Sequence, residues 1–261
     1  MTSLKTYHVN AFAAGPFSGN PAAVVPLDFW LSESLMQKLA AQNNLSETAF
    51  FVKTTDGFHI RWFTPKTEVD LCGHATLASA YVIFEILGFQ SDSIVFESKS
   101  GPLFVSKKGD EIFLNFPAVK SERIESFEGI EEAIGQSVSE IYKASDDYLL
   151  IFEDEKTVVN LDPDFGLLAK INARGIIASS KSEGYDFVCR FFAPKVGINE
   201  DPVTGSAFTK LIPFWAAIVK KDRMQACQIS ERRGEVSCQL LGDRVLMGGQ
   251  ANLYLQGDIM F

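Results

Sequence analysis

Short apolar segments, separated by turn-forming residues, run through the whole chain and predict many strands and a few helices. Residues 5–12 alternate between polar and apolar side chains, which is the pattern of a strand with one buried face. Further strand patterns in the first half, bounded by Gly, Pro, Asp and Ser, are residues 48–53, 58–63, 94–98, 103–106 and 112–116. Those of the second half are residues 148–152, 176–179, 185–192, 235–240, 244–247 and 252–255.

Two segments predict helices that are apolar on every side. Residues 75–87 are apolar nearly all round, and Gly88 is placed to end the helix. A helix that is apolar on all faces must be buried on all faces, so we expect a sheet of strands curled around it. Residues 206–220 are the equivalent segment of the second half, where Pro213 is expected to bend the helix or to shift its start.

A short sequence pattern occurs twice. Residues 61–66 read Arg-Trp-Phe-Thr-Pro-Lys, and residues 190–195 read Arg-Phe-Phe-Ala-Pro-Lys. Each copy is preceded by a helical pattern, at residues 32–45, with Ser32 as a good N-cap, and at residues 164–172. Each copy is followed by a small-residue turn and one of the two apolar helices. The same order of elements twice indicates a duplicated pair of domains, because the period is far too long for stacked short repeats.

The length of the chain agrees with two domains, since a domain usually has roughly 100–200 residues. The sequence has 261 residues, and we predict an N-terminal lobe of residues 1–118 and a C-terminal lobe of residues 119–261. The pattern leaves open whether the last strand returns to the first lobe.

Composition excludes several functional classes. Apolar residues make up 46% and charged residues 22%, as in an ordinary globular protein, and the longest apolar stretch is too short to span a bilayer. The net charge of −9, with no basic run, argues against nucleic acid as a partner. Three histidines and four widely separated cysteines offer no zinc-ligand spacing, so we expect no metal site. No secretory signal is visible, and we expect a cytoplasmic protein with reduced core cysteines that binds no membrane.

The turns that open the two apolar helices are candidate anion sites. Residues 72–74 read Cys-Gly-His and residues 204–206 read Thr-Gly-Ser, which places His74 and Ser206 at matching positions. The free N–H groups and the positive dipole end of a helix N-terminus attract carboxylate or phosphate groups. If the two termini face each other, one small anionic ligand contacts both. The alternatives are that His74 is an ordinary buried histidine and that Asp201, before a proline, is a cap or turn residue.

Glu47 is the candidate general acid and base. It lies between the end of a predicted helix and the apolar run of residues 49–52, and an apolar flank suits a carboxyl group that both takes and returns a proton. The alternative is an exposed loop carboxylate. Residues 15–21, rich in turn formers, are a further loop with conformationally special residues.

Several segments together resemble the PhzF-like family, which is named for the phenazine-biosynthesis isomerase and shares its fold with diaminopimelate epimerase. The matching segments are residues 10–12 (Asn-Ala-Phe), 19–22 (Gly-Asn-Pro-Ala), 44–50 (Asn-Leu-Ser-Glu-Thr-Ala-Phe), 72–78 (Cys-Gly-His-Ala-Thr-Leu-Ala) and 200–207 (Glu-Asp-Pro-Val-Thr-Gly-Ser-Ala). The resemblance implies an α+β fold of two similar lobes related by a pseudo-two-fold axis. Each lobe would be a β-barrel-like roll around a central apolar helix, with the active site between the lobes.

The same resemblance implies a cofactor-independent isomerase that relocates a proton on a small, carboxylate-bearing substrate, and a homodimer. By this resemblance Glu47 is the proton shuttle. The residues implied in substrate binding are Gly19, Asn20, Gly73, His74, Asp201, Gly205 and Ser206.

Two other functions stay open. Diaminopimelate epimerase uses one cysteine on each face of the substrate carbon, and Cys72 stands where one of them would be. Its counterpart in the second half is Thr204, whose hydroxyl cannot act as a thiolate does, so a two-cysteine mechanism is disfavoured. A racemase or epimerase that uses Cys72 with Glu47 remains, as does a non-catalytic binding protein that kept the fold.

Overall fold

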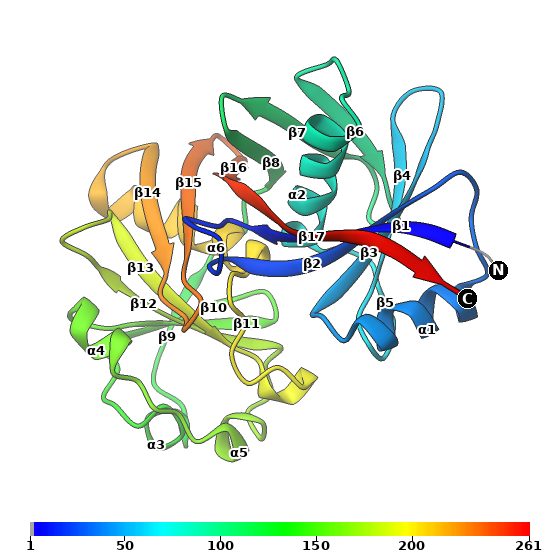
Figure 1. Cartoon of the computed structure of the whole chain (residues 1–261). Helices are drawn as coiled ribbons and strands as arrows, with labels where there is room; N and C mark the ends of the chain where they lie inside the picture. The colour runs from blue at the N-terminus through cyan, green and yellow to red at the C-terminus, as the bar shows by residue number, and fades with distance from the viewer. Residues whose placement is uncertain (1–2) are drawn as a thin grey trace. The chain divides into compact units, whose positions relative to one another are not determined.

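The computed structural model describes residues 3–261, which divide into two compact units (Figure 1). The first unit contains residues 3–116 and Met247–Phe261, and the second contains Pro117–Leu246. Both units are rich in strands and have few helices, so the fold is mixed α+β as expected. None of the helices within residues 3–261 is long and apolar enough to cross a membrane.

The first unit is built mainly from antiparallel and parallel strand pairs around one buried helix. Its strands are β1 (Ser3–Ala11), β2 (Asn20–Leu27), β3 (Glu47–Lys53), β4 (Phe58–Phe63), β5 (Glu68–Val69), β6 (Ser93–Glu97), β7 (Leu103–Lys108), β8 (Glu111–Pro117) and β17 (Ala251–Met260). Its helices are α1 (Glu33–Asn43) and α2 (Gly73–Tyr81), which continues as a π-helical turn, Val82–Ile86. The C-terminal strand β17, red in Figure 1, pairs antiparallel with the first strand.

The second unit repeats this mixture. Its strands are β9 (Glu122–Ile124), β10 (Glu140–Ala144), β11 (Asp147–Ile151), β12 (Gly175–Lys181), β13 (Phe187–Phe192), β14 (Arg223–Gln228) and β15 (Gly234–Leu241). Its helices are α3 (Ile130–Ile134), α4 (Glu155–Val159), α5 (Phe165–Leu168), the 3-10 turn Pro194–Val196 and α6 (Gly205–Val219). Strand β16 (Arg244–Gly249) crosses the boundary between the units.

The order of strand pairings is the same in both units. Along β1, β2, β3, β4, β6 and β7 the successive pairs are antiparallel, parallel, antiparallel, parallel and antiparallel. Along β10 to β15 the order is again antiparallel, parallel, antiparallel, parallel and antiparallel.

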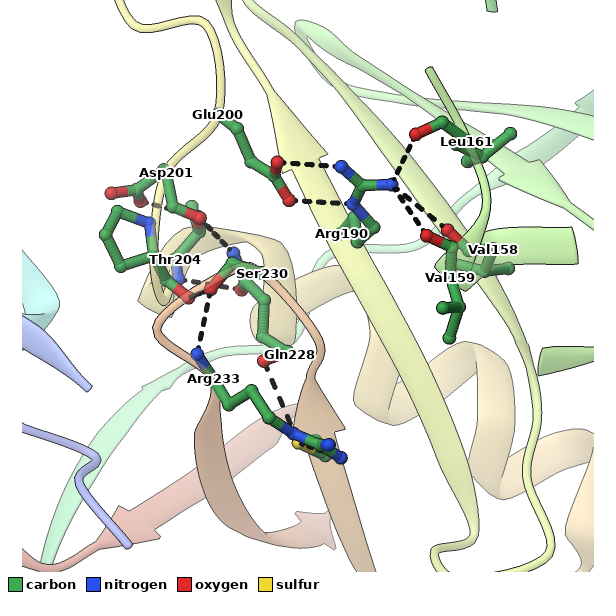
Figure 2. Close-up of polar contacts among 12 residues, drawn as sticks. Val158, Val159, Leu161, Arg190, Glu200, Asp201, Thr204, Gln228, Ser230 and Arg233 are labelled. Atoms are coloured by element: carbon green, nitrogen blue, oxygen red, sulfur yellow. Dashed lines mark hydrogen bonds and ion pairs between the residues drawn. The ribbon is translucent and has the colours of Figure 1, made fainter. Parts of the chain in front are cut away.

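The repeated arginine of the sequence pattern has the same local structure twice. Arg61 on β4 donates from Nε and one terminal nitrogen to both oxygens of Glu68, at 2.7 Å each. Arg190 on β13 makes the same fork to Glu200, at 2.8 Å each, and Figure 2 shows that its third nitrogen faces the backbone carbonyls of residues 158, 159 and 161. Each guanidinium also lies over the aromatic ring two residues further on. The repeated sequence pattern therefore corresponds to a bidentate arginine–glutamate ion pair that occurs in each unit.

Helix α2 is buried, as its apolar composition predicts. Residues 74–80 are all buried, and the helix packs against β1, β2 and β3. The expected burial on every face is absent only from the last turn, where Glu85 and Leu87 are exposed because the helix ends there. Gly88, which follows, has φ +66°. Ser32 caps α1 as predicted, accepting a hydrogen bond from the Leu35 amide.

Pro213 lies inside α6, and the helix begins at Gly205, so its start is not shifted and the other expected effect, a bend, stays a prediction. A proline has no N–H, which leaves the carbonyl four residues earlier without its helical donor. That carbonyl belongs to Thr209, and it accepts a hydrogen bond of 2.9 Å from the amide of Val119. A segment far away in sequence thus satisfies the group that the proline leaves free.

Other differences from the predicted elements have local causes. The helix expected at residues 164–172 is helical only over Phe165–Leu168, where Gly166 lowers helix propensity. The loop expected at residues 15–21 is shorter, because Asn20 already begins strand β2. This strand was not predicted, since it contains two prolines, which are uncommon inside sheets. The other strands that the pattern did not predict are β5, β9, β10 and β14.

Candidate active site

Glu47, His74 and Cys72 form one buried group in the first unit. Glu47 is the first residue of β3, and Cys72 and His74 flank the glycine that opens α2. Nε2 of His74 lies 3.1 Å from Oε2 of Glu47, and Nδ1 of the same ring lies 3.6 Å from the Cys72 sulfur. The carboxylate and imidazole side chains are 12% and 7% exposed. Glu47 is therefore not the exposed loop carboxylate of the alternative interpretation.

The facing atoms of Glu47 and His74 are not hydrogen-bonded. They are at ion-pair distance, yet the direction of the contact lies outside hydrogen-bond geometry, and within residues 3–261 neither atom has another partner. The two groups thus interact as charges when the ring is protonated, while the hydrogen-bonding capacity of the facing atoms is left unused.

The two neighbours of His74 change its titration. Burial opposes protonation of the ring, but the Cys72 and Glu47 side chains outweigh burial and raise the pKa of His74 well above the ordinary value of 6.5. Burial also raises the pKa of the Cys72 thiol, and the nearby Glu47 carboxylate adds to this. The thiol is therefore a poor source of thiolate near neutral pH.

The raised pKa of His74 predicts a pH-dependent stability. The folded protein holds this proton more tightly than the unfolded chain, so the resulting stabilisation is complete below about pH 6.5 and is lost as the pH rises through the folded pKa. Urea unfolding of the wild type and of His74→Gln from about pH 5 to about pH 9 measures it. The stability advantage of the wild type should shrink as the pH rises. An advantage that is constant or grows would contradict the raised pKa.

These three side chains do not form a metal centre of ordinary geometry. Their donor atoms lie within 4.8 Å of one another, but His74 offers one ring nitrogen to Glu47 and the opposite one to Cys72. A single ion accepts only one nitrogen of a given imidazole, so these contacts do not converge on one point.

Gly19 and Asn20 lie at the start of β2, where Asn20 is opposite Ala11 of β1. Gly19 has φ +77°, and a Cβ on it would lie 2.4 Å from the carbonyl oxygen of Ala11, so no other residue fits. Asn20 is completely buried. A structural role therefore accounts for Gly19, and the binding role expected for both residues stays a prediction.

In the second unit, Asp201 and Thr204 form a closed turn before α6 (Figure 2). The Thr204 hydroxyl donates to Oδ2 of Asp201 at 2.5 Å, and both residues are buried. Gln228, at the end of β14, holds the turn from inside. Its amide nitrogen donates to the Asp201 carbonyl at 2.7 Å, and its carbonyl oxygen accepts from the Thr204 amide at 2.9 Å. Asp201 is thus a turn residue, as the alternative interpretation expects, and its role in substrate binding stays a prediction.

Removal of the Gln228 amide should destabilise this turn. Gln228→Leu leaves the Asp201 carbonyl and the Thr204 amide buried without their partners, so we expect a loss of about 2 kcal/mol or more in unfolding free energy. Urea unfolding checks this, with Gln225→Leu as the control, because Gln225 is an exposed residue of the same strand. Equal losses in the two variants would show that the buried amide adds nothing.

Ser206 is held by a cluster of charged residues that the sequence did not reveal. Its hydroxyl accepts a hydrogen bond of 3.1 Å from Arg174. Arg174 also forms ion pairs with Asp146, at 3.1 Å, and with the fully buried Asp147, which in turn binds Lys210 of α6 at 2.5 Å. Ser206 is the second residue of α6, as His74 is the second residue of α2.

Apart from Gly19 and Asn20, the predicted site residues thus lie in two groups, one in each unit. The first comprises Glu47, Gly73 and His74 with Cys72, and the second comprises Asp201, Gly205 and Ser206 with Thr204. The N-cap residues Cys72 and Thr204 are both extended, with φ −145° and −112°, and neither side chain caps its helix. The residues missed by the sequence analysis are Gln228, Arg174, Asp147 and Lys210.

Comparison with known proteins identifies close relatives over almost the whole chain. Residues 9–257 match the family model described as phenazine biosynthesis-like protein. An uncharacterised isomerase of Pseudomonas aeruginosa is 46% identical over 256 residues, with 98% of each chain covered. Phenazine biosynthesis-like domain-containing protein 1 of Mus musculus is 38% identical over 286 residues, covering 98% of this chain and 99% of that protein.

Solved structures with the same fold include a member of the same family. A phenazine biosynthesis protein of the PhzF family from Enterococcus faecalis has a TM-score of 0.98 and 43% identity, with both chains fully covered. A hydroxyproline epimerase from Agrobacterium vitis has a TM-score of 0.61 at 9% identity, covering 98% of this chain and 92% of that one. The second likeness shows a shared fold only.

Proposed function

The protein is an isomerase of the phenazine biosynthesis-like family, and we propose that it relocates a proton on a small carboxylate-bearing metabolite with Glu47 as the general acid and base. One observation carries the proposal: Glu47 and His74 face each other as buried polar groups, and the facing atoms have no hydrogen-bond partner within residues 3–261. A ligand group that donates to the carboxylate and accepts from the imidazole would satisfy both.

Proton relocation between carbons needs one group that removes a proton and then returns it. A carboxylate can do both, because it accepts a proton as the anion and donates it as the acid. His74 beside it carries a ring N–H donor and, through its raised pKa, holds a proton to higher pH than an ordinary histidine. It is therefore suited to stabilise negative charge that develops on the substrate.

The backbone supplies the remaining binding groups in this proposal. Gly73 and Gly205 are the first residues of α2 and α6, whose early N–H groups have no helical acceptor. Substrate carboxylate groups would bind there, oriented by Asp201 and Ser206. The proposed function also includes the expected homodimer and activity without metal or organic cofactor.

The racemase alternative loses support from the contacts of Thr204. Its hydroxyl already donates to Asp201, so it does not supply a second base. Burial raises the pKa of Cys72, so little of the thiolate that would act as the other base is present near neutral pH. A mechanism with Glu47 as the single acid and base therefore fits the contacts better than one with two opposed bases.

A screen for solvent deuterium exchange tests the proposal. The protein is incubated in D2O with small cyclic and acyclic amino and hydroxy acids that raise its melting temperature, and loss of carbon-bound protons is followed by NMR. We expect at least one ligand to exchange a proton or to shift a double bond. A ligand that binds tightly but neither exchanges nor isomerises would favour the non-catalytic binding protein.

A further inference from the structure

We propose that Cys72 is a positioning residue that keeps a proton on Nε2 of His74, on the side of the ring that faces Glu47. The inference gives a role to the thiol, which the proposed proton transfer by Glu47 does not use. It rests on the proposed function for the importance of His74, but its claim concerns the resting protein and is testable without a substrate.

The thiol is the ring's hydrogen-bond contact. The Cys72 sulfur lies 3.6 Å from Nδ1, within hydrogen-bond distance for sulfur, whereas Nε2 has no hydrogen-bond partner within residues 3–261. Glu47 is near Nε2 but outside hydrogen-bond geometry. The contact at Nδ1 therefore acts on the choice between the two neutral forms of the ring, together with the charge of the Glu47 carboxylate beside Nε2.

The chemistry of that contact selects one form. A neutral imidazole carries one proton, on either nitrogen. The buried thiol keeps its own proton, since its pKa is raised, so it donates to Nδ1 and leaves the ring proton on Nε2. When the ring is doubly protonated, Nε2 carries a proton as well. In both charge states a donor faces the Glu47 carboxylate, which can only accept.

The backbone leaves the thiol available for this contact. Cys72 occupies the N-cap position of α2 in an extended conformation, yet its side chain makes no capping hydrogen bond. Its carbonyl accepts from the Thr76 hydroxyl at 2.5 Å and from the Thr76 amide at 3.1 Å, which fixes the residue at the start of the helix. A fixed Cβ two residues before His74 holds the sulfur at the ring.

NMR of protein labelled with 15N in histidine tests the assignment directly. The chain has three histidines, so His8 and His59 serve as internal references for His74. In the wild type we expect the neutral ring of His74 to be protonated on Nε2, with Nδ1 accepting a hydrogen bond. In Cys72→Ala the donor to Nδ1 is lost, so the neutral form with the proton on Nδ1 should become detectable.

Two further variants separate positioning from packing. Cys72→Ser keeps a hydroxyl donor on the same Cβ and should retain the Nε2 form. Cys227→Ala removes a buried thiol of the second unit and should leave the His74 signals unchanged. An Nδ1-protonated ring in the wild type, or unchanged His74 signals in Cys72→Ala, would overturn the inference.

Activity provides an independent readout once a substrate is known. Cys72→Ala should lower kcat about ten- to hundredfold with little change in KM, whereas Cys72→Ser should keep most of the activity. A loss of about a thousandfold in Cys72→Ser would overturn the positioning role and make Cys72 a catalytic base. If no substrate is ever found, the proposed function fails while the NMR result still decides the role of Cys72.

Discussion

Replacement of Glu47 by glutamine is expected to lower substrate turnover by about a thousandfold or more, a barrier increase of about 4 kcal/mol. Glutamine has the shape of glutamate and can occupy the same place beside His74, 3.1 Å from its ring nitrogen. It cannot take up and return a proton, so the fold and ligand binding should survive while proton exchange is lost. The loss should appear in kcat, since binding does not depend on the transferred proton.

Solvent deuterium incorporation measures this, and a thermal shift with the same ligand shows whether Glu47→Gln still binds it. The matched control is Glu97→Gln, because Glu97 is an exposed carboxylate on β6 of the same unit. Turnover near that of the wild type in Glu47→Gln would exclude Glu47 as the proton carrier. Loss of ligand binding together with turnover would instead make Glu47 a binding residue.

Replacement of Lys210 by methionine should destabilise the protein by about 3–5 kcal/mol, because it removes one partner of a buried charge. Lys210 and Asp147 are 5% and 0% exposed, and their side chains are 2.5 Å apart. Arg174 binds the same carboxylate oxygen of Asp147 as Lys210 does, and the other oxygen of Asp147 has no partner within residues 3–261. Arg174 alone would then have to compensate the buried carboxylate, and it is also the donor to Ser206.

Urea unfolding gives the size of this loss. Lys221→Met is the matched control, because Lys221 pairs with Asp186 at 2.6 Å but is 60% exposed, and an exposed pair contributes only about 0–1 kcal/mol. If Lys210→Met costs no more than Lys221→Met, the buried cluster does not stabilise the second unit. A loss of affinity for the ligand in Lys210→Met, beyond the loss of stability, would show that the cluster also orders Ser206.

The sequence by itself determined the features that depend on local pattern. Alternating strands, the apolar helix that became α2 and the repeated arginine motif were all visible, because side-chain periodicity and turn residues act over a few positions. Glu47 and His74 were recognised from their motifs, and the motifs fixed their places at the start of β3 and α2. The family also followed from the motifs and agrees with the match over residues 9–257.

Only the tertiary structure decided which distant groups satisfy one another. Gln228 closes a turn that begins at Asp201, 27 positions earlier, and Lys210 pairs with Asp147, 63 positions away. Pro213 is tolerated in α6 because Val119 supplies the missing donor. No local pattern predicts such pairs, since a buried polar group accepts any suitable partner that folding brings near, and the proximity is set by the path of the whole chain.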